Sequence, residues 1–141
     1  MTNYACLKAS AVLRVLFEEA GASVLLAAGE RLVSSRLVEV ETFRAVDRVR
    51  LLGQLDDTQT AIKRKELTDF LAMLDLFSVD DRVIERAKDS FAVNVRALDA
   101  LHVATAEVLA AETQGEPVEF WTHPERQATA ALSRGLTVRG V

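Results

Sequence analysis

The sequence predicts a three-layer α/β/α domain, in which helices cover both faces of a mainly parallel sheet of four or five strands. Short apolar runs alternate with amphipathic stretches along the chain, which is typical of strands joined by crossover helices. Half of the 141 residues are hydrophobic, and only 6 are glycine and 2 are proline. Such a chain has enough apolar surface to offset the entropy of ordering, and its length suits one domain over residues 1–141.

The first elements predicted are a strand, a helix and a second strand. Asn3–Leu7 is small and apolar enough to form a strand at the centre of the sheet. Ser10–Glu19 carries apolar residues at helical spacing, and Gly21 offers a stop. Val24–Gly29 predicts a further helical turn, and Arg31–Ser34 predicts the second strand.

Two longer helices follow. The hydroxyl of Ser35 can accept a hydrogen bond from an early N–H group, so it can cap a helix that runs to about Leu52. After a polar stretch, a second helix spans about Gln59–Leu74. Its predicted apolar stripe consists of Ile62, Leu67, Phe70, Leu71 and Leu74.

The second half of the chain continues the alternation. The predicted elements are an edge strand at Leu76–Val79, a helix at Asp81–Asp89 capped by Asp80, a helix at about Leu98–Glu112, a strand at Val118–Thr122, a helix at Glu125–Arg134 and a strand at Leu136–Val138. Gly135 suits the left-handed conformation in which many helices end.

Charge and hydropathy exclude some classes of function. The chain has 17 Lys and Arg against 21 Asp and Glu, a net charge of −4, so bulk charge does not hold it to nucleic acid. Three arginines, Arg44, Arg48 and Arg50, still recur on one predicted helix. No stretch reaches the roughly 18 apolar residues that a membrane span needs. We expect no signal peptide, no internal disulfide for the single Cys6, and a cytoplasmic location.

Four positions are candidates for a functional site. In open α/β sheets, ligands lie beyond the carboxyl ends of the strands. Lys8, Glu41, Asp99 and Pro124 each fall just after a predicted strand or early in a predicted helix, so they could converge there. Leu37 and Val40 are predicted on the same helix face as Glu41, which would point this carboxylate inward.

Two of these positions carry acids in segments that resemble a known family. Arg96–Ala106 resembles the signature helix of PIN-domain ribonucleases, particularly the VapC-type toxins, and the resemblance extends over nearly the whole chain. Ser34–Glu41 is similar to the family's helix opening. The resemblance implies a PIN-like fold, in which about four carboxylates gather around Mg²⁺ or Mn²⁺. Glu41 and Asp99 stand at two of those acidic positions.

The other two acidic positions are altered. Leu7–Ala11 resembles the family's Leu-Asp-Thr-Ser-Ala, with Lys8 in place of the acid and Ser10 retained. Trp121–Gln127 resembles a second family segment, with Pro124 at the position of its acid and Glu125 one residue along. The resemblance therefore implies a degenerate site, with Ser10 and Glu125 as supporting residues and His102 as a structural residue of the motif.

The charge of Lys8 decides the expected chemistry. Two unit charges about 4 Å apart interact by about 4 kcal/mol at an effective dielectric of about 20, and a divalent ion doubles this. An ammonium should therefore compete with a metal. We expect Lys8 to lie within about 4 Å of the Asp99 or Glu41 carboxylate as its counter-charge, with no metal cofactor and no metal-dependent ribonuclease activity.

Two functions follow as hypotheses. The first is a non-catalytic PIN-like domain, a pseudoenzyme that acts by binding a protein; the resemblance also suggests a homodimer. Family antitoxins often place an Arg in the acidic pocket, a contact that Lys8 would oppose, and RNA binding is less favoured. The alternative is an active Mg²⁺- or Mn²⁺-dependent endoribonuclease, the toxin of a toxin–antitoxin pair, using Glu41, Asp99, Glu125 and Glu18 as a displaced acidic site.

Overall fold

The sheet of this protein is parallel and has its first strand at the centre. The structure is a computed structural model, which describes residues 3–17, 31–113, 118–122 and 125–139, with the backbone alone at 125–128. Five strands in these ranges pair in the order β3-β2-β1-β4-β5. They are β1 (Tyr4–Leu7), β2 (Arg31–Ser35), β3 (Asp75–Phe77), β4 (Val118–Trp121) and β5 (Thr137–Arg139). This order confirms the sheet predicted from the sequence.

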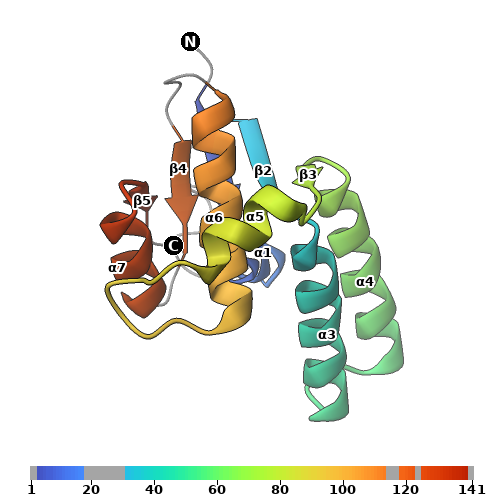
Figure 1. Cartoon of the computed structure of the whole chain (residues 1–141). Coiled ribbons are helices and arrows are strands. Elements are labelled where there is room, and N and C mark those ends of the chain that lie inside the picture. Colours follow the sequence, from blue (N-terminus) through green and yellow to red (C-terminus); the bar gives the residue numbers. More distant parts are fainter. Residues whose placement is uncertain (1–2, 18–30, 114–117, 123–124, 140–141) are drawn as a thin grey trace.

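Helices cover both faces of the sheet, as Figure 1 shows. One face packs against α1 (Ala9–Leu16), α3 (Leu37–Leu51) and α4 (Asp57–Leu71). The other packs against α6 (Ala97–Glu112) and α7 (Glu125–Ser133), and α5 (Asp81–Lys88) covers the outer side of α6. Successive side chains of β1 serve the two cores in turn, with Ala5 and Leu7 on the α1 side and Cys6 on the α6 side. The three-layer prediction is confirmed.

The helix α6 is buried on nearly all sides. Its buried side chains run from Ala100 through Leu109 with the exception of Leu101, which is partly buried. A helix buried in this way needs neighbours on opposite sides. The sheet and α5 supply them, and the buried part of α6 begins at Ala100, directly after Asp99.

The helices α3 and α4 lie side by side and extend beyond the sheet (Figure 1). Gly53 follows α3 with a φ of 78°, which favours glycine because it has no side chain to clash. Asp56 then caps α4 in a reciprocal arrangement: its carboxylate accepts from the Gln59 N–H, and the Gln59 side chain accepts from the Asp56 N–H.

The structure confirms some local predictions and corrects others. Asp80 caps α5 by accepting from the N–H groups of Arg82 and Val83. Gly135 has a φ of 82°, as its place after a helix predicts. The Ser35 hydroxyl does accept from the Leu37 N–H, at 3.2 Å, although Ser35 itself ends β2.

Four predictions based on helical periodicity were wrong or lie outside the described residues. The long helix ends at Leu71 rather than Leu74, and Ile62 is 52% exposed. Val40 is 63% exposed and does not share the inward direction of Glu41. The turn expected at Val24–Gly29 falls outside the described ranges. In those ranges, no helix has the length and apolar character required to cross a membrane.

Candidate functional site

The carboxyl end of the central strand positions Lys8. This residue directly follows β1 and stands at the N-cap of α1 with an extended backbone. Its N–H donates to the Trp121 carbonyl at 3.0 Å, and its own carbonyl accepts from the N–H groups of Ala11 and Val12. The Ser34 hydroxyl donates to the Leu7 carbonyl at 2.6 Å and ties β2 to the same point. The backbone of Lys8 is therefore fixed between β1, β4 and α1.

The side chain of Lys8 forms an ion pair with Asp99. Its Nζ lies 2.7 Å from Asp99 Oδ1, with the Lys8 side chain 7% and the Asp99 side chain 19% exposed. Asp99 lies in the first turn of α6, where the helix dipole favours an anion. The dipole of α1 disfavours a cation at its own N-cap, where Lys8 stands. Asp99 supplies the negative charge that stabilises the Lys8 ammonium there. The expected separation of about 4 Å or less is confirmed.

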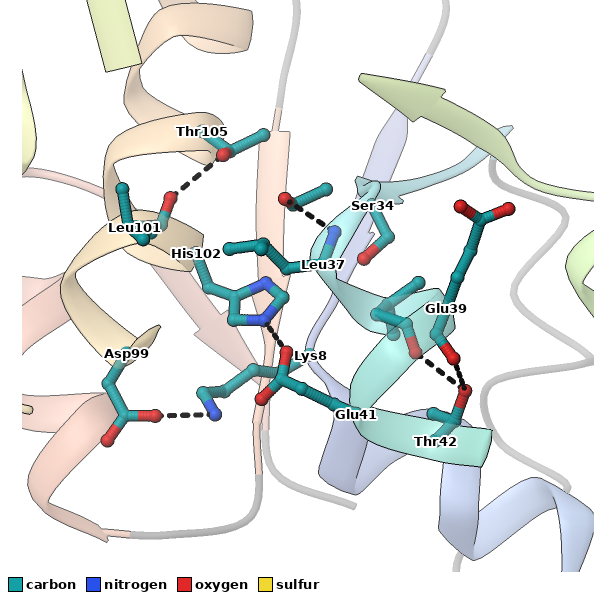
Figure 2. A network of polar contacts seen from close by, with 12 residues as sticks. Lys8, Ser34, Leu37, Glu39, Glu41, Thr42, Asp99, Leu101, His102 and Thr105 are labelled. Atoms are coloured by element: carbon teal, nitrogen blue, oxygen red, sulfur yellow. Dashed lines mark hydrogen bonds and ion pairs between the residues drawn. The ribbon is translucent and has the colours of Figure 1, made fainter. Parts of the chain in front are cut away.

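A second polar contact lies beside this pair. Glu41, in the second turn of α3, contacts the Nε2 atom of His102 through Oε1. His102 is 1% exposed, and the Glu41 side chain is 20% exposed. Figure 2 shows Lys8 extending between the two helices with its ammonium turned toward Asp99, while Glu41 points to His102. Both acids that the sequence singled out thus lie at the same end of the sheet, and each has a nitrogen partner.

This arrangement of strands, helices and acids has known relatives. The family model of the PIN domain matches residues 5–113. The chain belongs to the PIN-domain family. It is 35% identical over 106 residues to Ribonuclease VapC46 of Mycobacterium tuberculosis, a match that covers 75% of this chain and 71% of that protein. It is accordingly a PIN domain of the VapC type.

Solved structures share the fold of this PIN domain. VapBC2 from Rickettsia felis, solved with a DNA fragment from its promoter, matches with a TM-score of 0.66 and 13% identity over 97% of this chain and 98% of that one. A toxin–antitoxin complex from Klebsiella pneumoniae matches with a TM-score of 0.62 and 14% identity, over 87% of this chain and 88% of that one. PAE2754 from Pyrobaculum aerophilum matches with a TM-score of 0.62 and 16% identity, over 98% of this chain and 92% of that one.

The described side chains of this PIN domain do not fit the Mg²⁺ or Mn²⁺ ion that its family implies. Such ions need several oxygen ligands and counter-charge. Here Asp99 is paired with an ammonium and Glu41 with an imidazole. No group of three or more His, Cys, Asp or Glu side chains in the described ranges is arranged to hold a metal ion.

The remaining candidates are Ser10, Pro124, Glu18 and Glu125. Ser10 lies in the first turn of α1 and is partly buried. Pro124 and Glu18 fall outside the described ranges, and only the backbone of Glu125, which opens α7, is described. The assignment of Glu41, Asp99 and the altered positions to a functional site stays a prediction.

Sequence reasoning missed the Glu41–His102 contact. His102 was expected to be structural, and its near-complete burial agrees with this. One signal could have revealed the contact: Asp99 and His102 are three residues apart, so they lie on one face of α6. A helix that turns Asp99 toward the end of the sheet turns His102 toward it as well.

A second buried ion cluster was also missed. Glu107 of α6, 8% exposed, accepts from Arg134 at 2.6 Å and from Arg86 at 3.2 Å. Arg134 also donates to the carbonyls of Asp89 and Ser90, at 3.3 and 3.4 Å. Its guanidinium lies 3.9 Å from the centre of the Phe91 ring. Arg134 thus holds the segment that leads from α5 into α6.

Cys6 takes no part in this chemistry. Its side chain lies in the core of the sheet, and burial raises the pKa of its thiol to about 12. The thiolate is the nucleophilic form, so Cys6 is unreactive in the folded protein.

Proposed function

We propose that this VapC-type PIN domain acts by binding a protein and does not cleave RNA by metal-dependent chemistry. The observation that carries the proposal is the 2.7 Å pair between Lys8 and Asp99 at the carboxyl end of the sheet. The proposal treats the chain as a single domain that acts in the cytoplasm.

The electrostatic argument concerns a divalent ion near Asp99. A cation placed beside that carboxylate would also lie close to the Lys8 ammonium, and the two would repel each other by several kcal/mol at an effective dielectric of about 20. The ammonium already neutralises the charge of Asp99, so the attraction between Asp99 and the ion would offset little of this repulsion. Without a bound ion, no water is activated for hydrolysis of a phosphodiester.

The proposed partner is a protein of the antitoxin kind. Two of the structural relatives were solved as complexes, VapBC2 of Rickettsia felis and the toxin–antitoxin pair of Klebsiella pneumoniae. For this chain, an Arg of a partner placed over Asp99 would meet the like charge of Lys8. We therefore expect the partner to dock without a cation in that pocket.

An RNA cleavage assay tests the loss of activity. The purified protein is incubated with single-stranded and structured RNA in Mg²⁺ or Mn²⁺, and with a chelator as control. We expect no cleavage above the chelator control. Metal-dependent cleavage that disappears in both Glu41→Gln and Asp99→Asn would overturn the proposal and support an endoribonuclease with a displaced acidic site.

Affinity capture tests the protein-binding half of the proposal. The tagged chain is recovered from its native cells, and any captured protein is expressed, purified and titrated against it by calorimetry. We expect a complex of fixed stoichiometry that the exposed substitution Lys65→Glu on α4 leaves unchanged. Failure to obtain a stoichiometric complex would argue against a binding function even if RNA cleavage is absent.

A further inference from the structure

A cavity of about 420 Å³ lies over the amino ends of β1 and β2, beside the last turn of α6. Its lining includes Tyr4, Arg31, Asp75 and Phe77 from the sheet and Leu109 and Glu112 from α6. Glu112 follows Asp99 by thirteen residues, about 20 Å along α6, so the cavity lies at the other end of this helix from Asp99 (Figure 1). Its volume is in the range of sites that bind a small molecule.

The apolar part of the lining belongs to the core that α6 covers. Asp75 and Phe77 occupy alternate positions of β3, so their side chains point to the same face of the sheet. Tyr4 and Phe77 pack against that core, and Leu109, which is 5% exposed, is part of it. Two aromatic rings and an aliphatic side chain thus form one side of the cavity, and their packing in the core fixes its shape.

The polar part of the lining carries both signs of charge. The Nε atom of Arg31 donates to Asp75 Oδ2 at 2.5 Å, and the Arg31 guanidinium lies 5.9 Å from the centre of the Tyr4 ring. The contact with Asp75 uses one of the three guanidinium nitrogens, and the two Nη groups can still donate. Glu112, which also pairs with Arg82, adds a second carboxylate at the end of α6, where the helix dipole is negative. The side chains of Arg31 and Asp75 are 57% and 47% exposed, so a ligand from solvent can reach both.

These charges disfavour ligands that carry a single charge. A carboxylate on its own would meet Arg31 but also the like charges of Asp75 and Glu112, and an ammonium on its own would meet the like charge of Arg31. An α-amino acid carries both groups on one carbon atom, just as the charged groups of Arg31 and Asp75 contact each other. Its carboxylate can accept from the Nη groups of Arg31, whose fork suits two oxygens, while its ammonium donates to Asp75.

We propose that this cavity binds a free α-amino acid with an apolar side chain. Arg31 and Asp75 hold its two charged groups, Glu112 adds attraction for the ammonium, and the ligand side chain packs against the apolar side of the cavity. A ligand of about twelve non-hydrogen atoms at so open a site has a dissociation constant on the order of a millimolar. The inference goes beyond the protein-binding function proposed above and uses none of the residues on which that function rests.

Backbone amide NMR spectra recorded during a titration test both the binding and its place. The probes are L-phenylalanine, L-leucine and L-methionine, each added to several times the expected dissociation constant at constant pH. We expect shifts that saturate at the amides of Arg31, Phe77 and Glu112, while the amides of Lys8 and Asp99 stay unchanged. Shifts that fail to saturate with all three amino acids, or that arise only away from the cavity, would overturn the inference.

Two analogues of L-phenylalanine test the need for both charges in the parent protein. The first, 3-phenylpropionate, lacks the ammonium, and the second, 2-phenylethylamine, lacks the carboxylate. Each should bind at least about tenfold more weakly than L-phenylalanine, because it loses one charge-assisted contact and keeps the like-charge repulsion. Equal binding of either analogue would show that the cavity does not recognise a zwitterion.

Substitutions of the charged pair test the residues that hold the ligand. Arg31→Gln and Asp75→Asn each remove one charge and keep a polar side chain, so each should weaken the binding of L-phenylalanine at least about tenfold. Because this pair is exposed, the melting temperature without ligand should stay close to that of the parent protein. Lys65→Gln, which breaks another exposed pair on α4, is the matched control and should bind as the parent does. Unchanged binding in both Arg31→Gln and Asp75→Asn would refute the proposed site.

Discussion

The ammonium of Lys8 lies 2.7 Å from Oδ1 of Asp99 and joins the two helical layers across the end of the sheet. Lys8 opens α1 on one face, and Asp99 lies in the first turn of α6 on the other. Among the described side chains, the ammonium of Lys8 balances the charge of Asp99, and Glu41 contacts His102 instead.

The first prediction concerns the stability that this pair provides. Lys8→Met keeps the packing of the aliphatic chain but leaves Asp99 without its ammonium. We expect a loss of about 1–3 kcal/mol in the free energy of unfolding, between the values for exposed and fully buried pairs. Urea denaturation measures it. The matched control is Lys65→Met, whose pair with Asp69 is exposed and should contribute less than about 1 kcal/mol. Equal stability of Lys8→Met and the parent protein would show that the pair does not stabilise the fold.

The second prediction restores the acids. Lys8→Asp combined with Pro124→Asp should lower the melting temperature without metal, because an acid at residue 8 would lie beside Asp99 and the family resemblance assigns residue 124 to the same acidic site. Mg²⁺ or Mn²⁺ should raise it again, since an ion that binds only the folded state stabilises it by about 1.4 kcal/mol at ten times its dissociation constant. Thermal melts with and without millimolar metal measure both effects. If the parent protein gains as much from metal as the double variant, Lys8 does not take the place of the ion.

The third prediction separates the charge of Glu41 from its hydrogen bond. Glu41→Ala leaves the Nε2 atom of His102 without its partner in a buried position, which should cost about 1–3 kcal/mol. Glu41→Gln retains a polar partner and should cost less than about 1 kcal/mol. Chemical denaturation compares the two. Glu39→Ala, which removes an exposed partner of Arg36, is the control on the same helix. Equal losses in the free energy of unfolding for Glu41→Ala and Glu41→Gln would mean that the carboxylate charge, rather than the hydrogen bond to His102, stabilises the fold.

The fourth prediction concerns Arg134. Its removal in Arg134→Ala leaves the buried carboxylate of Glu107 with Arg86 alone and releases the carbonyls of Asp89 and Ser90. We expect a loss of about 2–4 kcal/mol and faster amide hydrogen exchange in residues 89–96, ahead of α6. Arg82→Ala removes an exposed arginine from the neighbouring α5 and should change the free energy of unfolding much less than Arg134→Ala does. Unchanged exchange in residues 89–96 would contradict the positioning role given to Arg134.

Local patterns in the sequence were sufficient for the order of the described elements and for some of their ends, although α4 ends at Leu71 rather than Leu74. The cap at Asp80 and the turn at Gly135 depend on hydrogen bonds and dihedral angles within a few residues, so the sequence predicts them directly. The exposure of individual side chains was harder to predict from the sequence. Helical spacing placed Ile62 and Val40 on inward faces, yet both are exposed, because a helix in a projecting hairpin has fewer neighbours than its apolar residues suggest.

By itself, the sequence determined the parallel α/β fold, the central place of Asn3–Leu7 and the approach of Lys8 to Asp99 or Glu41. The fold follows from strand–helix alternation, and the approach follows from the family resemblance together with the rule that strand ends converge on one edge of a parallel sheet. The structure decided that the partner of Lys8 is Asp99. Only the tertiary structure decided that Glu41 contacts His102 and that Arg134 forms an ion pair with Glu107. The two partners in each contact are 61 and 27 residues apart in the chain and come from different elements, so their pairing depends on how the helices pack together.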